Sequence, residues 1–333
     1  MNQFLSQPLS LVNGSVFILS GVILLGVVLG FVTYAIYFER KIIGWMQFRI
    51  GPNRTGPLGL LQTVADVLKL LLKEDIIPAA ADKPLFILAP LIAFTPAFAV
   101  LAVIPFTESL HFADMGVGIL YYIAISGITT LGVLTGAWSS NNKYSLMGGM
   151  RAAAQMISYE IPLIMSLVGV ILMTGSLNLV DIVKKQQEMG VWFFIPQIIG
   201  FCIFIVASLA ELSRTPFDLP ESESELVAGY HTEYTGFRMA FFFLAEYVYM
   251  FGMACLTTLI FLGGWLPPIA FLGFIPGIVW FIIKFCGVIF FLIWLRATMP
   301  RIRADQLMQL GWKVLLPLAL VNIFLTALIK ALV

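Results

Sequence analysis

The sequence predicts an all-α polytopic membrane protein that forms a single transmembrane domain over residues 1–333. Hydrophobic residues make up 60% of the chain and charged residues only 11%, and the mean hydropathy is +0.98. Eight separate stretches are apolar enough to cross a bilayer, which takes about 20 residues each. This composition, without a long polar block anywhere, is not that of a soluble domain.

The eight apolar stretches are the predicted transmembrane helices, and two further segments complete the domain. Residues 57–73 form a predicted amphipathic helix, and residues 213–236 form an acidic loop between the fifth and sixth helices. The eight predicted helices cover residues 14–38, 84–106, 116–138, 153–175, 191–212, 237–263, 272–296 and 312–332.

The distribution of lysine and arginine predicts how these helices are oriented. Of the 19 lysines and arginines, 15 fall in the odd-numbered connections, whereas three fall in the even-numbered connections and the C-terminal end. Positively charged residues favour the cytoplasmic side of a membrane. We therefore expect both termini on the outer, periplasmic side and the loop 213–236 on the cytoplasmic side.

Two pairs of glycines have the GxxxG spacing that lets transmembrane helices approach closely. They are Gly26 with Gly30 in the first helix and Gly132 with Gly136 in the third. Because the chain holds 28 glycines, this spacing also arises easily by chance.

Polar side chains form one narrow stripe on the predicted amphipathic helix. Gln62, Asp66, Lys69 and Lys73 follow one another at intervals of four, three and four residues, which places them on one helix face. One interpretation is an interfacial helix that lies on the membrane with its stripe in water. The other is a helix covered on both sides whose stripe lines a cavity, because the apolar arc is wider than one lipid-facing side needs. The two interpretations are compatible.

Acidic residues are concentrated between the fifth and sixth predicted helices. The 36 residues from Glu211 to Glu246 contain seven of the 18 carboxylates and two arginines, Arg214 and Arg238. The seven carboxylates belong to Glu211, Asp218, Glu221, Glu223, Glu225, Glu233 and Glu246.

Three glutamates lie at membrane depth in the predicted helices. Glu160 is about two turns inside the fourth, Glu211 closes the fifth, and Glu246 is about three turns into the sixth. Such a group costs a few kcal/mol unless it faces the bundle interior or water. Carboxyl groups in such places can hold a proton and release it when a nearby charge changes, which predicts a proton relay. The structural alternative is pairing with a basic residue, and Arg214 lies one turn beyond Glu211.

Two further features of the acidic loop have alternative interpretations. Glu221, Glu223 and Glu225 alternate along the chain and either extend the relay or form a solvated acidic face. The loop aromatics are candidates for lining a pocket for a flat lipophilic ligand, and the alternative is that they anchor at the membrane interface. They are Phe217, Tyr230, Tyr234 and Phe237, next to Arg214 and Arg238. Lys284 is a further charge inside a predicted helix, which a neutral lysine or a partner carboxylate would explain.

The sequence offers little for a cofactor or a catalytic centre held by this chain alone. Its three cysteines have no CxxC spacing and its two histidines are far apart, so a metal site, an iron–sulfur cluster, a haem or a disulfide framework is not expected. It has no basic tail or patch for nucleic acid. No nucleophile elbow, phosphate-binding loop or metalloprotease motif occurs. We therefore expect no catalytic residue in this chain, and any electron carrier to lie elsewhere.

Four segments resemble the signature segments of one protein family. They are ERKIIGWMQFRIGPNRTGPLGLLQTVADVLKLLLKED, RAAAQMISYE, AELSRTPFDLPESESELVAGYHTEYTGF and RATMPRIRADQLMQLGWK. In this order, across nearly the whole chain, they are similar to the subunit that joins the membrane and peripheral arms of NADH:quinone oxidoreductase, respiratory complex I. That subunit is called H in bacteria and 1 in mitochondria. The departures are small, since some relatives have a ninth C-terminal helix and Ser222 stands where Gly or Ala is frequent.

The resemblance implies roles for individual residues. It places the amphipathic helix beside the quinone entrance, which favours the cavity interpretation. The residues that it places near the quinone chamber, together with the two proposed above from the loop, are Glu39, Arg40, Asp66, Arg214, Phe217, Arg296 and Arg301. The residues that it places in the proton relay are Glu160, Glu211 and Glu246, linked to the chamber by Glu221, Glu223 and Glu225.

The resemblance also implies a function and a set of partners. The chain is expected to be the quinone-chamber and coupling subunit of a proton-translocating NADH:quinone oxidoreductase in the bacterial cytoplasmic (inner) membrane. Quinone is the expected substrate, while NADH and the iron–sulfur clusters are expected in partner subunits. The expected partners are hydrophilic subunits that carry the terminal cluster, small membrane subunits and antiporter-like subunits. The alternatives are the homologous subunit of a membrane-bound hydrogenase, a self-contained proton or ion transporter, and a structural anchor.

Overall fold

The computed structural model describes residues 11–220 and 223–332, and this part of the chain contains helices and no strand. Its α-helices are α2 (Leu11–Met46), α3 (Gln62–Leu72), α4 (Lys83–Ala99), α5 (Gly118–Ser126), α6 (Ile128–Ser139), α7 (Lys143–Thr174), α8 (Leu179–Met189), α9 (Ile198–Glu211), α10 (Glu223–Leu226), α11 (Gly236–Ile260), α12 (Gly277–Thr298), α13 (Ala304–Gln309) and α14 (Leu316–Leu332). Short 3₁₀ turns are η1 (Pro57–Gly59), η2 (Val100–Val103), η3 (Gly229–His231) and η4 (Ala270–Leu272), and a π-helical turn, η5 (Leu310–Leu315), joins α13 to α14.

Seven helical stretches within the described residues are long and apolar enough to span a membrane. Three of them combine consecutive elements: α4 continues into η2, α5 into α6, and α13 through η5 into α14. Each of the seven coincides with a predicted transmembrane helix. The multi-pass, all-helical architecture is therefore confirmed, whereas the orientation of the termini stays a prediction.

The fifth predicted transmembrane helix corresponds to α9, which is shorter than expected. It has 14 residues, and at 1.5 Å per residue it spans about 21 Å, less than the roughly 30 Å of a bilayer core. Residues 191–197, which were predicted to be its first turns, form turns instead. The count of eight spans therefore also stays a prediction.

Two helix boundaries and one whole helix differ from the prediction because local caps and tertiary contacts decide them. Helix α7 begins ten residues earlier than predicted, where the Asn142 side chain accepts a hydrogen bond from the Tyr144 amide at 2.9 Å. Helix α2 continues to Met46 through charged residues that ended the apolar run. Helix α8 was not predicted, and Asn178 caps it by accepting from the Val180 amide at 2.8 Å.

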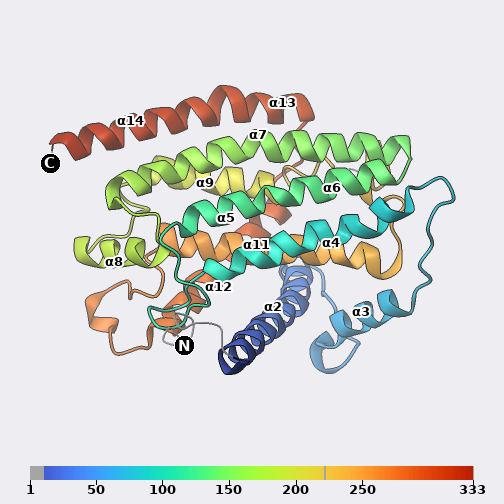
Figure 1. Ribbon diagram of the computed structural model, residues 1–333, viewed down its shortest axis with the longest axis horizontal. Helices are drawn as coiled ribbons and strands as arrows, with labels where there is room; N and C mark the ends of the chain where they lie inside the picture. Colours follow the sequence, from blue (N-terminus) through green and yellow to red (C-terminus); the bar gives the residue numbers. More distant parts are fainter. Residues whose placement is uncertain (1–10, 221–222, 333) are drawn as a thin grey trace.

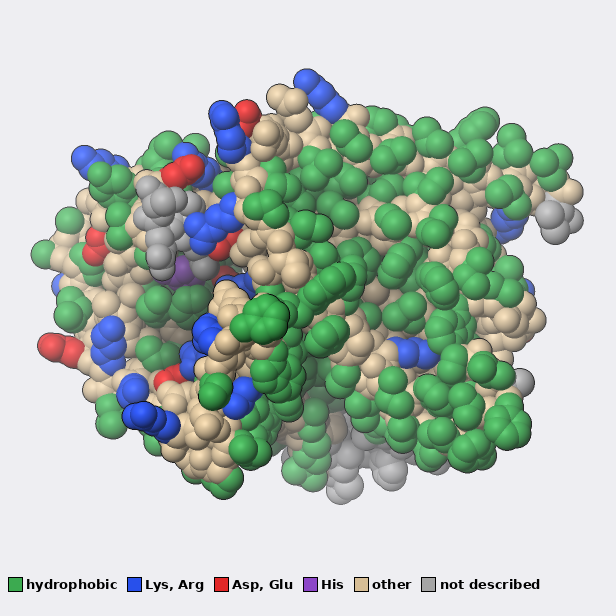
Figure 2. Space-filling model, turned by 180° about the vertical axis from the view of Figure 1, so that it is seen from behind, with side chains coloured by type: hydrophobic (Ala, Val, Ile, Leu, Met, Phe, Trp, Pro, Cys, Tyr) green, Lys and Arg blue, Asp and Glu red, His purple; other side chains and the backbone are tan. Residues whose placement is uncertain are grey.

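Helix α11 lies inside the bundle and contacts α4, α12, α2 and α3, while α7 contacts α6, α9 and α14 (Figure 1). Fully buried apolar side chains on α9 and α11, such as Phe204, Met250 and Leu256, belong to the main hydrophobic core. The segments before α4, between α6 and α7, and between α9 and α11 gather at one end of the bundle. Figure 2 shows charged side chains concentrated at that end of a face that is otherwise mostly hydrophobic.

Lys284, the charge inside the seventh predicted helix, is held by backbone oxygens. Its ammonium donates hydrogen bonds to the carbonyls of Leu262, Gly264 and Leu266 at 2.6, 3.0 and 2.6 Å, and it lies 4.1 Å from the centre of the Trp192 ring. These carbonyls belong to the non-helical segment that follows α11, and a buried carbonyl needs a hydrogen-bond donor. Lys284 thus fixes the segment after α11 to α12.

The two GxxxG pairs have different outcomes. A Cβ atom on Gly132 would lie 2.5 Å from the backbone nitrogen of Ala93 on α4, and one on Gly136 would lie 3.1 Å from Phe242 on α11. Around Gly26 and Gly30 no atom of the described chain lies within 4 Å of such a Cβ. The close helix approach is therefore confirmed for the second pair, whereas the first pair makes no close contact within this chain.

We expect Gly132→Ala to destabilise the subunit by roughly 1–3 kcal/mol, because α4 and α6 must separate to admit the methyl group. The amount of assembled complex in membranes and its thermal transition measure the effect. Gly26→Ala adds the same methyl group where the chain leaves space and is expected to change neither quantity. Equal behaviour of the two variants would contradict the close packing of α4 on α6.

Candidate functional site

Glu39 is the centre of a buried group of charges at the loop-rich end of the bundle. It lies in α2, is only 5% exposed, and accepts hydrogen bonds at one oxygen from Arg214 and from the Tyr247 hydroxyl, both at 2.9 Å. Arg296 of α12 donates to the other oxygen. The Arg214 guanidinium also lies 4.4 Å from the centre of the Tyr247 ring. Residues from α2, α11, α12 and the segment after α9 thus meet at one carboxylate.

This Glu39 cluster, formed by Glu39, Arg214, Arg296 and Tyr247, carries an excess of positive charge. Burial by itself lowers the pKa of Arg214, but the Glu39 carboxylate beside it raises the pKa above its ordinary value, so the guanidinium stays charged. One carboxylate therefore faces two guanidinium groups. The Nε atom of Arg214 has no hydrogen-bond partner among the described residues, which leaves a buried donor open to a ligand or water.

A second pair of charges adjoins this cluster through the next residue of α2. Arg40 forms an ion pair with Asp66 of α3 at 2.5 Å, and Gln62 donates to the other Asp66 oxygen at 3.0 Å. Asp66 of the polar stripe thus faces α2 and Gln62 supports it, whereas Lys69 is exposed. Several apolar side chains of α3 are also exposed, so both the interfacial and the cavity interpretation of this helix stay open.

Arg301, between α12 and α13, and Phe217, in the acidic loop, lie near the Glu39 cluster. Arg301 pairs with Asp218 at 3.2 Å, and burial raises the pKa of the Asp218 carboxyl although this arginine opposes the shift. Phe217 is buried against the Tyr159 ring at 5.7 Å between centres, and its carbonyl accepts a hydrogen bond from Gln155 at 2.8 Å. In this structure Phe217 therefore belongs to the packed core beside the charges.

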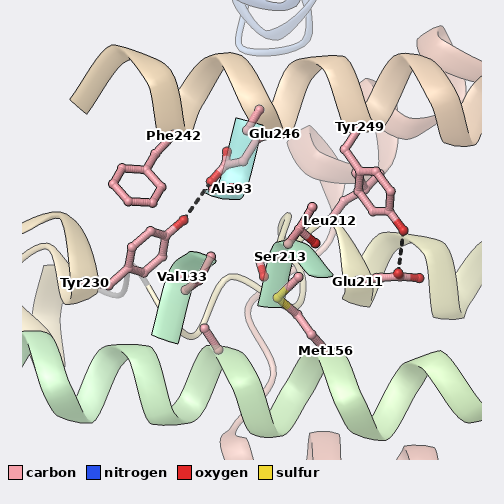
Figure 3. Close-up of a pocket in the computed structure, with 13 residues that line it drawn as sticks. Ala93, Val133, Met156, Glu211, Leu212, Ser213, Tyr230, Phe242, Glu246 and Tyr249 are labelled. Atoms are coloured by element: carbon pink, nitrogen blue, oxygen red, sulfur yellow. Dashed lines mark hydrogen bonds between the residues drawn. The ribbon is translucent and has the colours of Figure 1, made fainter. Parts of the chain in front are cut away.

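Two of the predicted relay glutamates, Glu211 and Glu246, line one internal cavity (Figure 3). Glu211 accepts a short hydrogen bond, 2.5 Å, from the Tyr249 hydroxyl, and its other oxygen has no partner among the described residues. Glu246 accepts from the Tyr230 hydroxyl at 3.2 Å. The cavity has a volume of about 50 Å³, enough for about three water molecules. Water in it could connect the two carboxylates.

Glu160, the third predicted relay residue, lies just beyond this cavity. It follows Met156, which lines the cavity, by one turn of α7. One of its carboxylate oxygens lies beside the junction of α5 and α6, 3.0 Å from the position that a Cβ atom on Gly127 would occupy. The structure therefore brings Glu160 near the Glu211 end of the cavity without placing it in the lining.

The acids in the middle of the loop are only partly described. Glu221 lies outside the described residues, and Glu223 begins α10. Glu225 is exposed and pairs with Arg151 of α7 at 2.5 Å. For Glu225 this is the geometry of a solvated ion pair, which is worth little to stability. The link that these three acids were predicted to form stays a prediction.

Two further tyrosines and one histidine complete the site, and sequence patterns gave little indication of them. Tyr247 and Tyr249, which bind Glu39 and Glu211, were not predicted, although their positions one and three residues after Glu246 were a usable signal. His231 is buried 4.0 Å from Glu246. Burial lowers the pKa of His231 to about 4 despite the nearby carboxylate, so it is neutral at pH 7.

Within the described ranges no three His, Cys, Asp or Glu side chains are placed to hold a metal ion. The fold and the site define a polytopic membrane protein with a buried, positively charged cluster joined to a cavity lined by carboxylates.

Comparison with known proteins identifies the family. The model of the family described as NADH dehydrogenase matches residues 19–327, and the chain belongs to this family. Similar curated proteins are named as the H subunit of NADH-quinone oxidoreductase. The one from Brevibacillus brevis is 68% identical over 99% of this chain and 97% of its own length. Those from Anoxybacillus flavithermus (68%, covering 100% and 99%) and Bacillus cereus (69%, covering 98% and 98%) are similarly close.

Proposed function

We propose that this chain is the quinone-chamber and coupling subunit of a proton-translocating NADH-quinone oxidoreductase. The names of its relatives support the complex to which it is assigned. One structural observation carries the coupling role: a single turn of α11 touches both parts of the site. Tyr247 of this turn binds Glu39, while Glu246 and Tyr249 belong to the carboxylate cavity.

The Glu39 cluster suits a site beside which a quinone is reduced. Reduction places negative charge on the quinone oxygens before protons arrive, and fixed cationic groups in a site of low dielectric constant stabilise developing negative charge. Arg214 and Arg296 supply that charge, and Glu39 holds both in place. Figure 2 shows the surface hollowed at this end, with charged side chains around the hollow. Electrons come, in this proposal, from an iron–sulfur cluster in a hydrophilic partner subunit.

The coupling step uses the connection from Arg214 to Glu211, which are three residues apart. A change of charge beside Arg214 alters the electrostatic potential at Glu211 and Glu246, and their carboxyl groups respond by taking up or releasing a proton. Water in the cavity between them allows that proton to move. The next carboxyl group beyond the cavity is that of Glu160 on α7. From there the proton path continues into small membrane subunits and antiporter-like subunits of the complex.

The proposed setting is the bacterial cytoplasmic membrane, with both termini on its outer side. The loop-rich end, which carries the Glu39 cluster, then faces the hydrophilic subunits and the cytoplasm. This orientation depends on the charge distribution. Cysteine accessibility measured from each side of sealed vesicles tests it, with labels in residues 47–56 and 107–116 expected to react from opposite sides.

Photo-crosslinking tests the chamber directly. A photoreactive quinone analogue in membranes that contain the whole complex is expected to label this chain in α2, α3 or the segment after α9. Excess unlabelled quinone should suppress the labelling. Labelling confined to other subunits would overturn the chamber role.

We expect Asp66→Asn to slow quinone reduction while the complex still assembles. The change removes the charge that pairs with Arg40 but keeps a side chain of the same shape that can accept from Gln62. Because both members of the pair are partly exposed, the effect on stability is small, about 1 kcal/mol or less. NADH-driven quinone reduction in membranes gives the rate, and native gel analysis gives the assembly. A wild-type rate of quinone reduction would contradict the cavity interpretation of α3 and favour the interfacial one.

A further inference from the structure

We propose that the groove between α4, α6 and α7 binds an acyl chain of an anionic phospholipid, whose phosphate is held by Lys83 and Lys143. This site lies on the outside of the bundle and is separate from the Glu39 cluster and the carboxylate cavity. In Figure 1, α6 lies between α4 and α7, and it packs against both.

The groove has the size and lining of a lipid-chain site. Its volume is about 410 Å³, within the range of roughly 300–1,000 Å³ that small-molecule sites occupy. No charged side chain lines it, and one threonine is the only residue in the lining with a hydroxyl group. The lining consists of Leu85, Leu134, Thr135, Trp138, Leu146 and Met150.

Two lysines stand where the groove reaches the end of the bundle. Lys83 and Lys143 are the first residues of α4 and α7. Backbone and side-chain contacts bring these two helix starts to one corner, because the Asp82 amide donates to the Ser139 carbonyl at 2.9 Å and the Asn141 side chain donates to the Ala80 carbonyl at 3.0 Å. Both lysines are exposed, and both can reach a ligand at this corner.

The charges of these lysines are not neutralised within the described part of the chain. Neither Lys83 nor Lys143 forms an ion pair there, and the contact of Lys143 is with the Tyr144 ring, 5.7 Å from its centre. The carboxylates nearest to them are Asp82, which is exposed and forms no ion pair among the described residues, and Glu233, which accepts from Asn142 at 2.5 Å. The corner therefore keeps a net positive charge. Two cations above an apolar groove complement an anionic headgroup with an acyl chain.

The depth of the groove matches a lipid that stands upright in the leaflet. Trp138 is 68% exposed at the lysine end, and exposed tryptophan is typical of the membrane interface. Met150 is seven residues beyond Lys143, which places the far end of the groove about 10 Å deeper along α7. The headgroup thus meets the lysines while the chain covers the apolar lining. If this end faces the cytoplasm, the leaflet there is the one rich in anionic lipids.

A photoreactive lipid tests the site in the intact complex. The complex is reconstituted into bilayers that contain phosphatidylglycerol with a diazirine in its acyl chain, and labelled peptides are mapped by mass spectrometry. We expect labelling within residues 131–150. In the double variant Lys83→Gln, Lys143→Gln we expect this labelling to fall about thirtyfold, since each lysine contributes about 1 kcal/mol to holding an anionic lipid and about 1.4 kcal/mol is a factor of ten.

Matched variants and a second lipid show whether the labelling depends on the groove and on the headgroup charge. Lys313→Gln removes an exposed lysine elsewhere and is expected to leave the labelling unchanged, and Thr135→Trp, which fills the groove but keeps both lysines, is expected to abolish it. The corresponding phosphatidylcholine probe is expected to label weakly, and equally in the chain without substitutions and in the lysine variants. Equal labelling by both lipids, or no response to the lysine variants, would overturn the proposal. A photoreactive residue at position 135 that crosslinks to another subunit instead of lipid would assign the groove to a protein helix.

Discussion

Glu39→Gln is expected to abolish quinone reduction and to weaken assembly of the subunit. The variant keeps the shape of the side chain but leaves Arg214, which is 5% exposed, without its carboxylate. Removing one member of a buried ion pair costs about 3–5 kcal/mol, because the remaining charge is uncompensated. NADH-driven quinone reduction in membranes and the thermal transition of the purified complex measure the two effects.

Two companion variants separate the charge effect from a general disturbance. Tyr247→Phe removes one hydrogen bond to Glu39 and keeps every charge, so it is expected to cost only about 1–3 kcal/mol. The double variant Glu39→Gln, Arg214→Gln removes both buried charges, and Arg296, which is partly exposed, can turn towards water. We expect assembly to recover in this double variant while quinone reduction stays low. Wild-type stability of Glu39→Gln alone would show that Arg214 does not depend on this carboxylate.

Glu211→Gln is the second change with a large expected effect, and it tests coupling rather than stability. Glutamine has nearly the same volume and can still accept the hydrogen bond from Tyr249, so the packing around the cavity is retained. It cannot exchange a proton. If Glu211 moves protons, quinone-linked proton pumping is expected to fall about a hundredfold or more, since a positioned acid–base group typically contributes about 10²–10⁴-fold. Pumping is measured in vesicles by a pH-sensitive dye, together with the rate of quinone reduction.

Glu188→Gln is the matched control for this experiment. It makes the same chemical change at a surface ion pair with Lys185, where the glutamate side chain is 66% exposed, and exposed pairs contribute about 1 kcal/mol or less. We expect nearly normal pumping in this variant. Tyr249→Phe adds a second comparison, because it removes the short hydrogen bond to Glu211 while leaving the carboxyl group. Unaltered turnover and pumping in Glu211→Gln would refute the coupling role proposed for this chain.

The arrangement of the site explains why sequence reasoning reached some of its members and not others. Charged residues inside apolar segments are conspicuous, which is why Glu160, Glu211 and Glu246 stood out. Tyr247 and Tyr249 did not, because a tyrosine in an apolar helix has the same pattern whether it packs in the core or binds a carboxylate. The ion pair between Glu39 and Arg214 could not be predicted from sequence patterns either, because the two residues are 175 positions apart along the chain.

Helix boundaries show the same division between local and tertiary causes. Apolar runs located seven spanning stretches because the bilayer imposes a minimum length of apolar chain. They misjudged α9, whose predicted first turns are not helical, and they ended the first helix before Glu39. Hydropathy treats a charged residue as a helix end at the membrane surface. In this fold α2 continues because Arg214, Arg296 and Tyr247 compensate the buried carboxylate.

The sequence by itself determined the class of protein, the positions of most helices, the family and the types of residue that carry the charge. These follow from local composition and from long, specific motifs. The tertiary structure alone decided that Glu39 is shared by two arginines, that Glu211 and Glu246 line one cavity, and that Gly132 but not Gly26 permits a close helix contact. The physical reason is that the free energy of a buried charge, or of a missing Cβ atom, depends on which distant side chains come within a few ångströms.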